Sequence, residues 1–158
     1  MLPGGIKIDV VEGGGTRQES VANGLRQIST RAVVVHDAAR PFLAPDTVRE
    51  LGVVLEGSDA VIPVIPVGET VKEIDGLDVV RTVDRSRLVL SQTPQMFLVD
   101  SLRAAHERAI SDGYLATDDA QLVERYGGVV KTIPGSRRNI KLTYPEDFEL
   151  AESILRMN

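Results

Sequence analysis

Residues 32–41 read AVVVHDAARP, a short run of apolar and mostly β-branched residues that passes directly into polar and charged ones. A strand that is apolar along its whole length is typical of a sheet covered by helices on both faces, and therefore of a parallel sheet. Open α/β sheets bind their ligands beyond the carboxyl ends of the strands. This stretch therefore predicts an α/β fold with a ligand site at residues 36–41.

Helical and strand-like segments alternate on both sides of this strand. Strands are predicted over residues 6–11, 59–63, 88–91, 129–133 and 139–143, and helices over 18–28, 45–55, 99–110, 117–126 and 145–155. The Asp75-Gly76 pair joins two alternating runs, 70–74 and 77–83, which is the signal of a β-hairpin. The pattern predicts a single domain over residues 1–158, with a mostly parallel sheet and a protruding hairpin arm at about 66–89.

The composition narrows the class of protein. The chain of 158 residues carries a net charge of -5 and has no cysteine. The absence of cysteine excludes disulfide bonds, thiolate metal sites and thiol nucleophiles, and the acidic charge argues against a general nucleic-acid binder. The sequence has neither a basic-then-apolar leader nor an apolar run of the roughly 18 residues that a membrane-spanning helix needs. We expect a cytoplasmic protein that binds neither nucleic acid nor membrane.

Two charged residues, Asp37 and Arg40, follow the apolar strand directly. A carboxylate at this place can hold a metal ion or a ribose hydroxyl, and a guanidinium can clamp a phosphate. Alternatively, the two side chains form an ion pair that fixes the loop. His36 has no Ser or Cys beside it in the sequence and is interpreted as structural.

Further polar segments each have a structural and a functional interpretation. The sequence GGGT at 13–16 either lets backbone N–H groups approach an anion or a base, or forms a flexible turn. TDDA at 117–120 is typical of a helix N-cap, with metal binding by its two acids as the alternative. DRSR at 84–87 is typical of a solvated turn, and Lys141 points away from its apolar neighbours in a predicted strand.

Six segments in order resemble the 2-C-methyl-D-erythritol 4-phosphate cytidylyltransferase family of the non-mevalonate isoprenoid pathway. Together they span nearly the whole chain. They are VVEGGGTRQESVANGL (10–25), VHDAARPFL (35–43), IPVIPVGETVKE (62–73), VDRSRLVLSQTPQMF (83–97), ATDDAQLVERYG (116–127) and NIKLTYPEDFELAE (139–152).

The resemblance implies a Rossmann-like nucleotidyltransferase fold, a three-layer sandwich. It also implies an enzyme that transfers CMP from CTP to 2-C-methyl-D-erythritol 4-phosphate and releases pyrophosphate. In the family, the acceptor phosphate attacks the α-phosphorus of CTP in line, while Mg²⁺ and cationic side chains stabilise the charge, as phosphoryl transfer requires. Relatives that use ribitol 5-phosphate share much of the pattern. The alternatives are therefore that acceptor, or a non-catalytic dimeric remnant that binds a polyol phosphate.

The resemblance also implies roles for individual residues. Lys141 and Asp37 are the implied catalytic residues, and Asp37 is the implied metal ligand. In the family, the hairpin arm clasps a partner across a homodimer, so Arg85 would reach the acceptor from the neighbouring subunit. By motif match, the cytosine would be held by Gly14, Gly15 and Ser20, the ribose and phosphates would lie near Asp37 and Ala38, and the acceptor would be approached by Arg40, Thr70, Arg85, Thr93, Thr117 and Lys141.

One family feature has no counterpart here. The family opens with a strand and a glycine-rich loop of the form A-A-G-x-G-x-R, followed by P-K-Q, and nothing in residues 1–10 is similar to it. That loop surrounds the triphosphate and supplies an Arg and a Lys regarded as catalytic. We therefore expect a truncated domain whose isolated chain is impaired in turnover.

Overall fold

Helices and strands alternate along residues 8–156, which is the part of the chain that the computed structural model describes. In chain order the elements are α1 (Arg17–Leu25), β1 (Ala32–Val35), α2 (Pro45–Val54), β2 (Ala60–Pro66), β3 (Val71–Asp75), β4 (Asp78–Val83), β5 (Val89–Ser91), β6 (Gln95–Leu98), α3 (Val99–Asp112), α4 (Asp119–Arg125), β7 (Val130–Pro134) and α5 (Glu146–Arg156).

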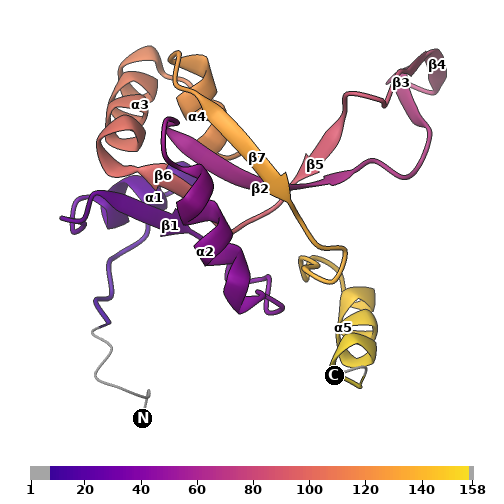
Figure 1. Cartoon of the computed structure of the whole chain (residues 1–158). Coiled ribbons are helices and arrows are strands. Elements are labelled where there is room, and N and C mark those ends of the chain that lie inside the picture. The colour runs from indigo at the N-terminus through magenta and orange to yellow at the C-terminus, as the bar shows by residue number, and fades with distance from the viewer. Residues whose placement is uncertain (1–7, 157–158) are drawn as a thin grey trace.

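The alternating side chains of β2 set the layers of the fold. Neighbouring residues of a strand point to opposite faces, so Ala60 and Ile62 pack into one core cluster while Val61 packs into another. Residues of α1, α3 and α4 complete the first cluster, and Leu51 and Leu55 from α2 and its end complete the second. Figure 1 shows α3 and α4 on one side of the sheet and α2 on the other. The predicted three-layer α/β sandwich is confirmed.

The central sheet is mixed, with the strand order β1-β6-β2 and with β7 on the other side of β2. Strands β1, β2 and β7 share one direction, because β6 is antiparallel to both β1 and β2 and β7 is parallel to β2. The predicted mostly parallel sheet is confirmed as a mixed one, since three of its five strands run in one direction while β5 and β6 run in the opposite direction. β1 is less covered than its sequence predicts: β6 is its only strand partner within residues 8–156, and Val34 is 37% exposed.

β5 and β6 form one interrupted strand beside β2. β5 pairs with residues 64–66 of β2 and β6 with residues 60–61, and between them lie Gln92, Thr93 and Pro94, with a cis peptide bond before Pro94. This interruption explains why β2 runs through Pro63 instead of ending there. Pro63 has no N–H to donate, and its carbonyl accepts from the backbone N–H of Gln92 at 2.9 Å.

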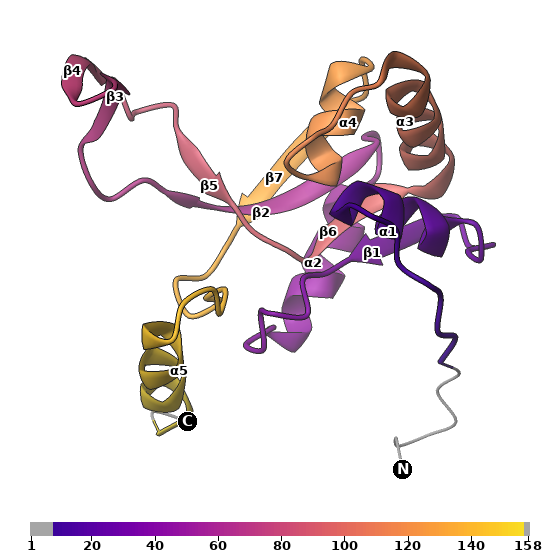
Figure 2. The same ribbon diagram turned by 180° about the vertical axis from the view of Figure 1, so that it is seen from behind.

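The predicted hairpin forms and projects from the body of the domain. Within residues 8–156, β3 and β4 pair with each other alone, and they turn at Gly76, whose φ of 57° suits a residue without a side chain. Figures 1 and 2 both show this arm extending away from the central sheet. Its large apolar side chains lie in solvent, among them Leu77, Val79 and Val80.

Three predictions about local structure need correction. The predicted strand at 6–11 falls partly outside the described residues, and 8–11 form no strand. The predicted strand at 139–143 is an irregular segment, because its backbone bonds to a loop: the N–H of Leu142 donates to the carbonyl of Ala39 at 2.8 Å. β6 lies where no strand was predicted.

The last helix, α5, stands apart from the other helices in both views (Figures 1 and 2). Ala151 and Ile154 are buried on one side of it, while Phe148 and Leu155 remain more than half exposed. None of the helices in residues 8–156 is long and apolar enough to cross a membrane.

Candidate functional site

A pocket of about 230 Å³ gathers polar side chains from five parts of the chain at the carboxyl end of β1. Five of its residues are ones that the sequence predicted. The ten lining residues are Arg17, Asp37, Arg40, Ser91, Gln92, Thr93, Gln95, Thr117, Asp118 and Lys141. A site beyond the end of a strand is where an α/β sheet binds ligands.

Asp37 is at the centre of the charges in this pocket. Its Oδ2 lies 3.1 Å from Nζ of Lys141 and 3.6 Å from Nε of Arg40, and its Oδ1 lies 3.7 Å from Nε of Arg17. Nε of Arg40 is buried and has no hydrogen-bond partner within residues 8–156. Three cations therefore surround Asp37, and the carboxylate of Asp118 also lines the pocket, so the site combines several cations with acidic groups and one unsatisfied donor.

The ligand interpretation and the loop-fixing interpretation of Asp37 and Arg40 both find support. Nη1 of Arg40 donates to the carbonyl of Asn139 at 2.7 Å, which ties the loop after β1 to the segment that carries Lys141. The backbone N–H of Arg40 also closes a turn on the carbonyl of Asp37. Ala38, between them, is exposed. The loop is fixed by these bonds, and its charges still face the pocket.

His36 acts as a structural link, as its sequence context predicts. Its Nε2 lies 3.0 Å from the carbonyl of Arg40, which can only accept, so Nε2 carries the proton. In the neutral ring, Nδ1 then accepts from the Thr93 hydroxyl at 3.1 Å. The same hydroxyl accepts from the backbone N–H of Asp37 at 3.0 Å. With the ring in that tautomer, the Thr93 hydroxyl has no further proton to donate, and toward a ligand its oxygen can only accept.

Buried amides hold the Lys141 segment against the interrupted strand. Nδ2 of Asn139 donates to the carbonyl of Thr93 at 2.8 Å. Nε2 of Gln92 donates to the carbonyl of Ser136 at 2.9 Å, and the N–H of Ser136 returns a bond to Oε1 of Gln92 at 3.1 Å. These bonds replace the ladder of the strand predicted at 139–143 and place Lys141 beside Asp37.

The TDDA segment caps α4, as the N-cap interpretation predicts. Oδ1 of Asp118 accepts from the N–H of Gln121 at 2.9 Å, and Oδ2 accepts from Nε2 of Gln95 at 2.9 Å. Within residues 8–156 no group of three or more His, Asp or Glu side chains is arranged to hold a metal ion. Thr117 lines the pocket next to this cap.

The glycine segment lies at the start of α1 and contributes no lining residue. The N–H of Gly14 donates to the Ser20 hydroxyl at 3.0 Å, and the N–H of Gly15 donates to Glu19 at 2.6 Å. A Cβ on Gly14 would come within 2.2 Å of the Cβ of Glu19, so only glycine fits this turn. Arg17, two positions after Gly15, lines the pocket.

Besides Gly14 and Gly15, four of the predicted substrate-binding residues do not line the pocket: Ser20, Ala38, Thr70 and Arg85. Thr70 precedes β3, and Arg85 lies at the foot of the arm, where its guanidinium donates to the carbonyl of Gly68. Both side chains are exposed.

The sequence prediction missed several pocket residues. Arg17 had a signal, since it follows a glycine turn at the first position of a helix. The amides of Gln92 and Gln95 had none, because they join the site only through the interruption between β5 and β6.

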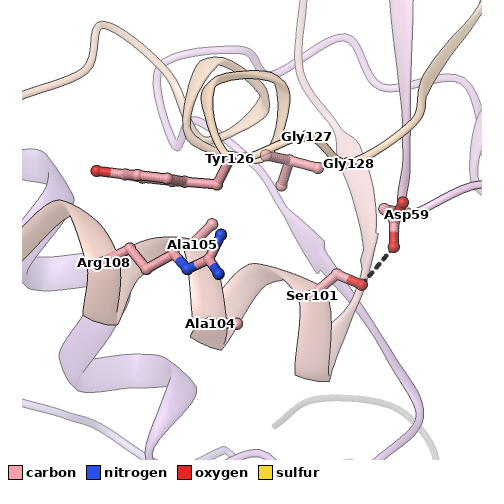
Figure 3. Close-up of a pocket in the computed structure, with 9 residues that line it drawn as sticks. Asp59, Ser101, Ala104, Ala105, Arg108, Tyr126, Gly127 and Gly128 are labelled. Atoms are coloured by element: carbon pink, nitrogen blue, oxygen red, sulfur yellow. Dashed lines mark hydrogen bonds between the residues drawn. The ribbon is translucent and has the colours of Figure 1, made fainter.

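A second pocket lies between α3, the end of α4 and the start of β2 (Figure 3). Its carboxylate, Asp59, is already bonded to the Ser101 hydroxyl at 2.5 Å and to the N–H of Val129 at 2.8 Å. These bonds hold the pKa of Asp59 below its usual value. The Arg108 guanidinium lies 5.7 Å from the Tyr126 ring centre. No residue predicted to be functional lies here, so we assign the site to the Asp37 pocket.

The fold and the Asp37 pocket define an α/β protein whose polar, cation-rich site suits a phosphate compound. The family model described as 2-C-methyl-D-erythritol 4-phosphate cytidylyltransferase matches residues 1–157, and the chain belongs to that family. This confirms the resemblance on which the sequence predictions rested.

Individual relatives agree with this assignment. The enzyme named 2-C-methyl-D-erythritol 4-phosphate cytidylyltransferase in Geobacillus thermodenitrificans is 49% identical over 145 residues, which cover 91% of this chain and 64% of that protein. The one in Saccharopolyspora erythraea is 47% identical, covering 94% of this chain and 68% of that protein. The crystal structure of the Thermus thermophilus protein of the same name superposes with a TM-score of 0.86 at 40% identity, covering 98% of this chain and 80% of that one. The chain thus spans about two thirds of the length of the curated relatives it matches.

Proposed function

We propose that this protein takes part in the transfer of CMP from CTP to 2-C-methyl-D-erythritol 4-phosphate, with release of pyrophosphate. The single observation that carries the proposal is the convergence of Arg17, Arg40 and Lys141 on Asp37 in one pocket. Family membership supplies the substrates. Phosphoryl transfer depends chiefly on positioning and charge stabilisation, and these are the properties that such a pocket provides.

The cations of the pocket would bind and orient the acceptor phosphate. The side chain of Lys141 is about half exposed, so its ammonium can move from Asp37 to a phosphate oxygen. Nε of Arg40 lies 3.6 Å from Oδ2 of Asp37 and has no hydrogen-bond partner within residues 8–156, so it has a donor to offer. A phosphate held by both would point one oxygen at the α-phosphorus of CTP. Positive charge preorganised around the transferred group lowers the barrier.

Magnesium is part of the proposal. Asp37 is the residue that would hold it, and a site with one protein carboxylate suits Mg²⁺, which usually completes its shell with substrate phosphates and water. When bound, the ion would neutralise charge on the phosphates of CTP. Asp37 itself also orients the three cations around it.

The remaining site residues stay proposals. Gly14 and Gly15 would offer backbone to the cytosine with Ser20, although in this structure both N–H groups bond to side chains of α1. Ala38 would lie near the ribose, and Thr117 near the acceptor.

We also propose that the chain is a single domain, that it works in the cytoplasm, and that it forms a homodimer through the arm. A two-stranded ribbon is marginal alone, and this one exposes Leu77, Val79 and Val80. Contact with a second copy would cover these side chains. Thr70 and Arg85 do not line the pocket of their own chain, and in such a dimer we propose that they reach the pocket of the partner.

A pyrophosphate-release assay tests the function. The protein would be incubated with CTP, Mg²⁺ and either methylerythritol phosphate or ribitol 5-phosphate, beside a Lys141→Met variant. We expect release that requires methylerythritol phosphate, is slow because of the impaired turnover expected from the sequence, and is lost in the variant. Release that is equal without an acceptor, or equal with ribitol 5-phosphate, would contradict the proposal.

A further inference from the structure

A buried carboxylate, Asp119, lies directly behind the pocket and has no part in the function proposed so far. Its side chain is 1% exposed, and its Oδ2 accepts from Nη1 of Arg17 at 2.7 Å. Its Oδ1 lies 3.1 Å from Nε2 of His106, which is itself 3% exposed. Burying a carboxylate is costly unless it is paired and hydrogen-bonded.

The partners of Asp119 satisfy it at both oxygens. Burial alone would raise the pKa of Asp119, but the hydrogen bond from His106 and the charge of Arg17 together hold that pKa below its usual value. Nδ1 of His106 is buried and has no hydrogen-bond partner within residues 8–156, so the described bond of this ring is the one to Asp119. Because its pKa is lowered, Asp119 is ionised at neutral pH, and Arg17 balances its charge.

Arg17 has donors left over for a ligand. A guanidinium carries five N–H donors in a planar fork. One nitrogen is bonded to Asp119, and Nε lies 3.7 Å from Asp37, beyond hydrogen-bond distance. The side chain is 39% exposed and lines the pocket.

Attachment of α1 does not require this ion pair. The side-chain amide of Gln18 already ties α1 to the connection between α3 and α4, donating to the carbonyl of Tyr114 at 3.1 Å and accepting from the N–H of Ala116 at 3.0 Å. A buried ion pair is also weak evidence for a stabilising role, because desolvation offsets much of its attraction. The geometry favours orientation of Arg17 as the purpose of the pair.

We propose that Asp119, fixed by His106, is a positioning residue that holds the Arg17 guanidinium in the pocket as an anion-binding group. Arg17 binds phosphate oxygens of the substrate or of the released pyrophosphate. The inference rests on the proposed function only in taking a phosphate compound as the ligand.

Inorganic pyrophosphate, titrated calorimetrically in magnesium-free buffer, is the probe. The double-mutant cycle compares wild type with Arg17→Gln, Asp119→Asn and the variant that carries both changes. Arg17→Lys is the conservative variant. Arg49→Gln, on the exposed face of α2, is the matched control. Because bonds to charged groups are the strong ones, we expect each single variant of the cycle to bind about tenfold more weakly or worse. The double variant should bind no more weakly than Arg17→Gln. Arg17→Lys should recover part of the affinity, and Arg49→Gln should match wild type.

The NMR signals of the His106 ring provide a second measurement that does not depend on Asp119→Asn folding. Pyrophosphate should shift them in wild type, through Arg17 and Asp119, and should leave them unmoved in Arg17→Gln. The inference is overturned by unchanged affinity in Asp119→Asn, by losses that add in the double variant, or by absence of pyrophosphate binding to wild type. A coupled cycle in a protein that makes no cytidylyl product would overturn the proposed function and leave the inference standing.

Discussion

Nζ of Lys141 lies 3.1 Å from Oδ2 of Asp37, although 104 positions separate the two residues in the sequence. Asn139 is one cause of this contact, because its buried amide fastens the Lys141 segment to the carbonyl of Thr93. The pair places a cation and a carboxylate at the mouth of one pocket. Its two members therefore provide the first test of the assigned site.

Replacing Lys141 by methionine removes the charge and keeps most of the side-chain length. One lost donor to transition-state charge typically lowers kcat by about 10²–10³-fold, and we expect a loss of that size. Lys131→Met is the matched control, because Lys131 is an exposed lysine on β7 that bonds to the carbonyl of Glu56. Steady-state rates of pyrophosphate release measure both variants, and equal losses would argue against a special role of Lys141.

Asn139→Ala should weaken both stability and activity. It leaves the buried carbonyl of Thr93 without this donor, a loss of about 1–3 kcal/mol. Asn23→Ala is the control, since Asn23 makes a single bond to the carbonyl of Glu12 at the surface and should change stability by less than about 0.5 kcal/mol. Urea unfolding compares them. A variant at Asn139 as stable as wild type would show that the amide does not hold this segment.

Gly14→Ala and Gly24→Ala should have opposite effects. A methyl group on Gly14 meets the Cβ of Glu19 at 2.2 Å, so the turn before α1 must shift and stability falls. Gly24 lies within α1 with no atom near its would-be Cβ, and alanine there should stabilise by about 0.5–1 kcal/mol. Thermal unfolding measures the stability of both variants. A change of stability with the same sign in both would contradict the predicted clash at Gly14.

The stability contributed by Asp119 should depend on pH. Its folded-state pKa is lowered, so the contribution is fully present above the unfolded value of about 3.9 and is lost as the pH falls through the folded value. We expect Asp119→Asn to be less stable than wild type at neutral pH, and the difference to narrow in strong acid. Asp46→Asn, at an exposed ion pair on α2, is the control with little change. Urea unfolding from neutral pH to strong acid measures the difference in unfolding free energy between wild type and Asp119→Asn. A difference that stays constant over this pH range would contradict the lowered pKa of Asp119.

The arm gives a prediction about assembly. Leu77→Asp places a charge at a fully exposed apolar position on the turn, and it should shift the protein from dimer to monomer. Val53→Asp changes an exposed valine on α2 and should leave the dimer intact. Sedimentation velocity over a concentration series measures both. A wild type that stays monomeric at every concentration would remove the proposed dimer.

Much of the fold follows from local sequence. The apolar run at 32–35, the proline at the start of α2 and the Asp75-Gly76 turn each specify their element through short-range physics, and each element formed where predicted. β6 could not be predicted from local sequence, because its residues are paired through long-range contacts with β1 and β2. The same is true of the extended segment at 139–143, whose partners are a loop and two buried amides.

The candidate site was predictable where its residues follow a secondary-structure boundary. Asp37, Arg40 and Thr117 come at such boundaries, and they line the pocket. The Asp119–Arg17 contact was not predictable, since no spacing rule relates residues 102 positions apart.

The most direct measurement of the central claim is ³¹P NMR of the protein with CTP, methylerythritol phosphate and Mg²⁺. Cytidylyl transfer predicts that the acceptor monoester signal disappears while a diphosphodiester and free pyrophosphate appear in equal amounts. Loss of those signals in Lys141→Met, with Lys131→Met unchanged, would connect the reaction to the pocket described above. Persistence of the monoester signal in wild type at all times would contradict the account.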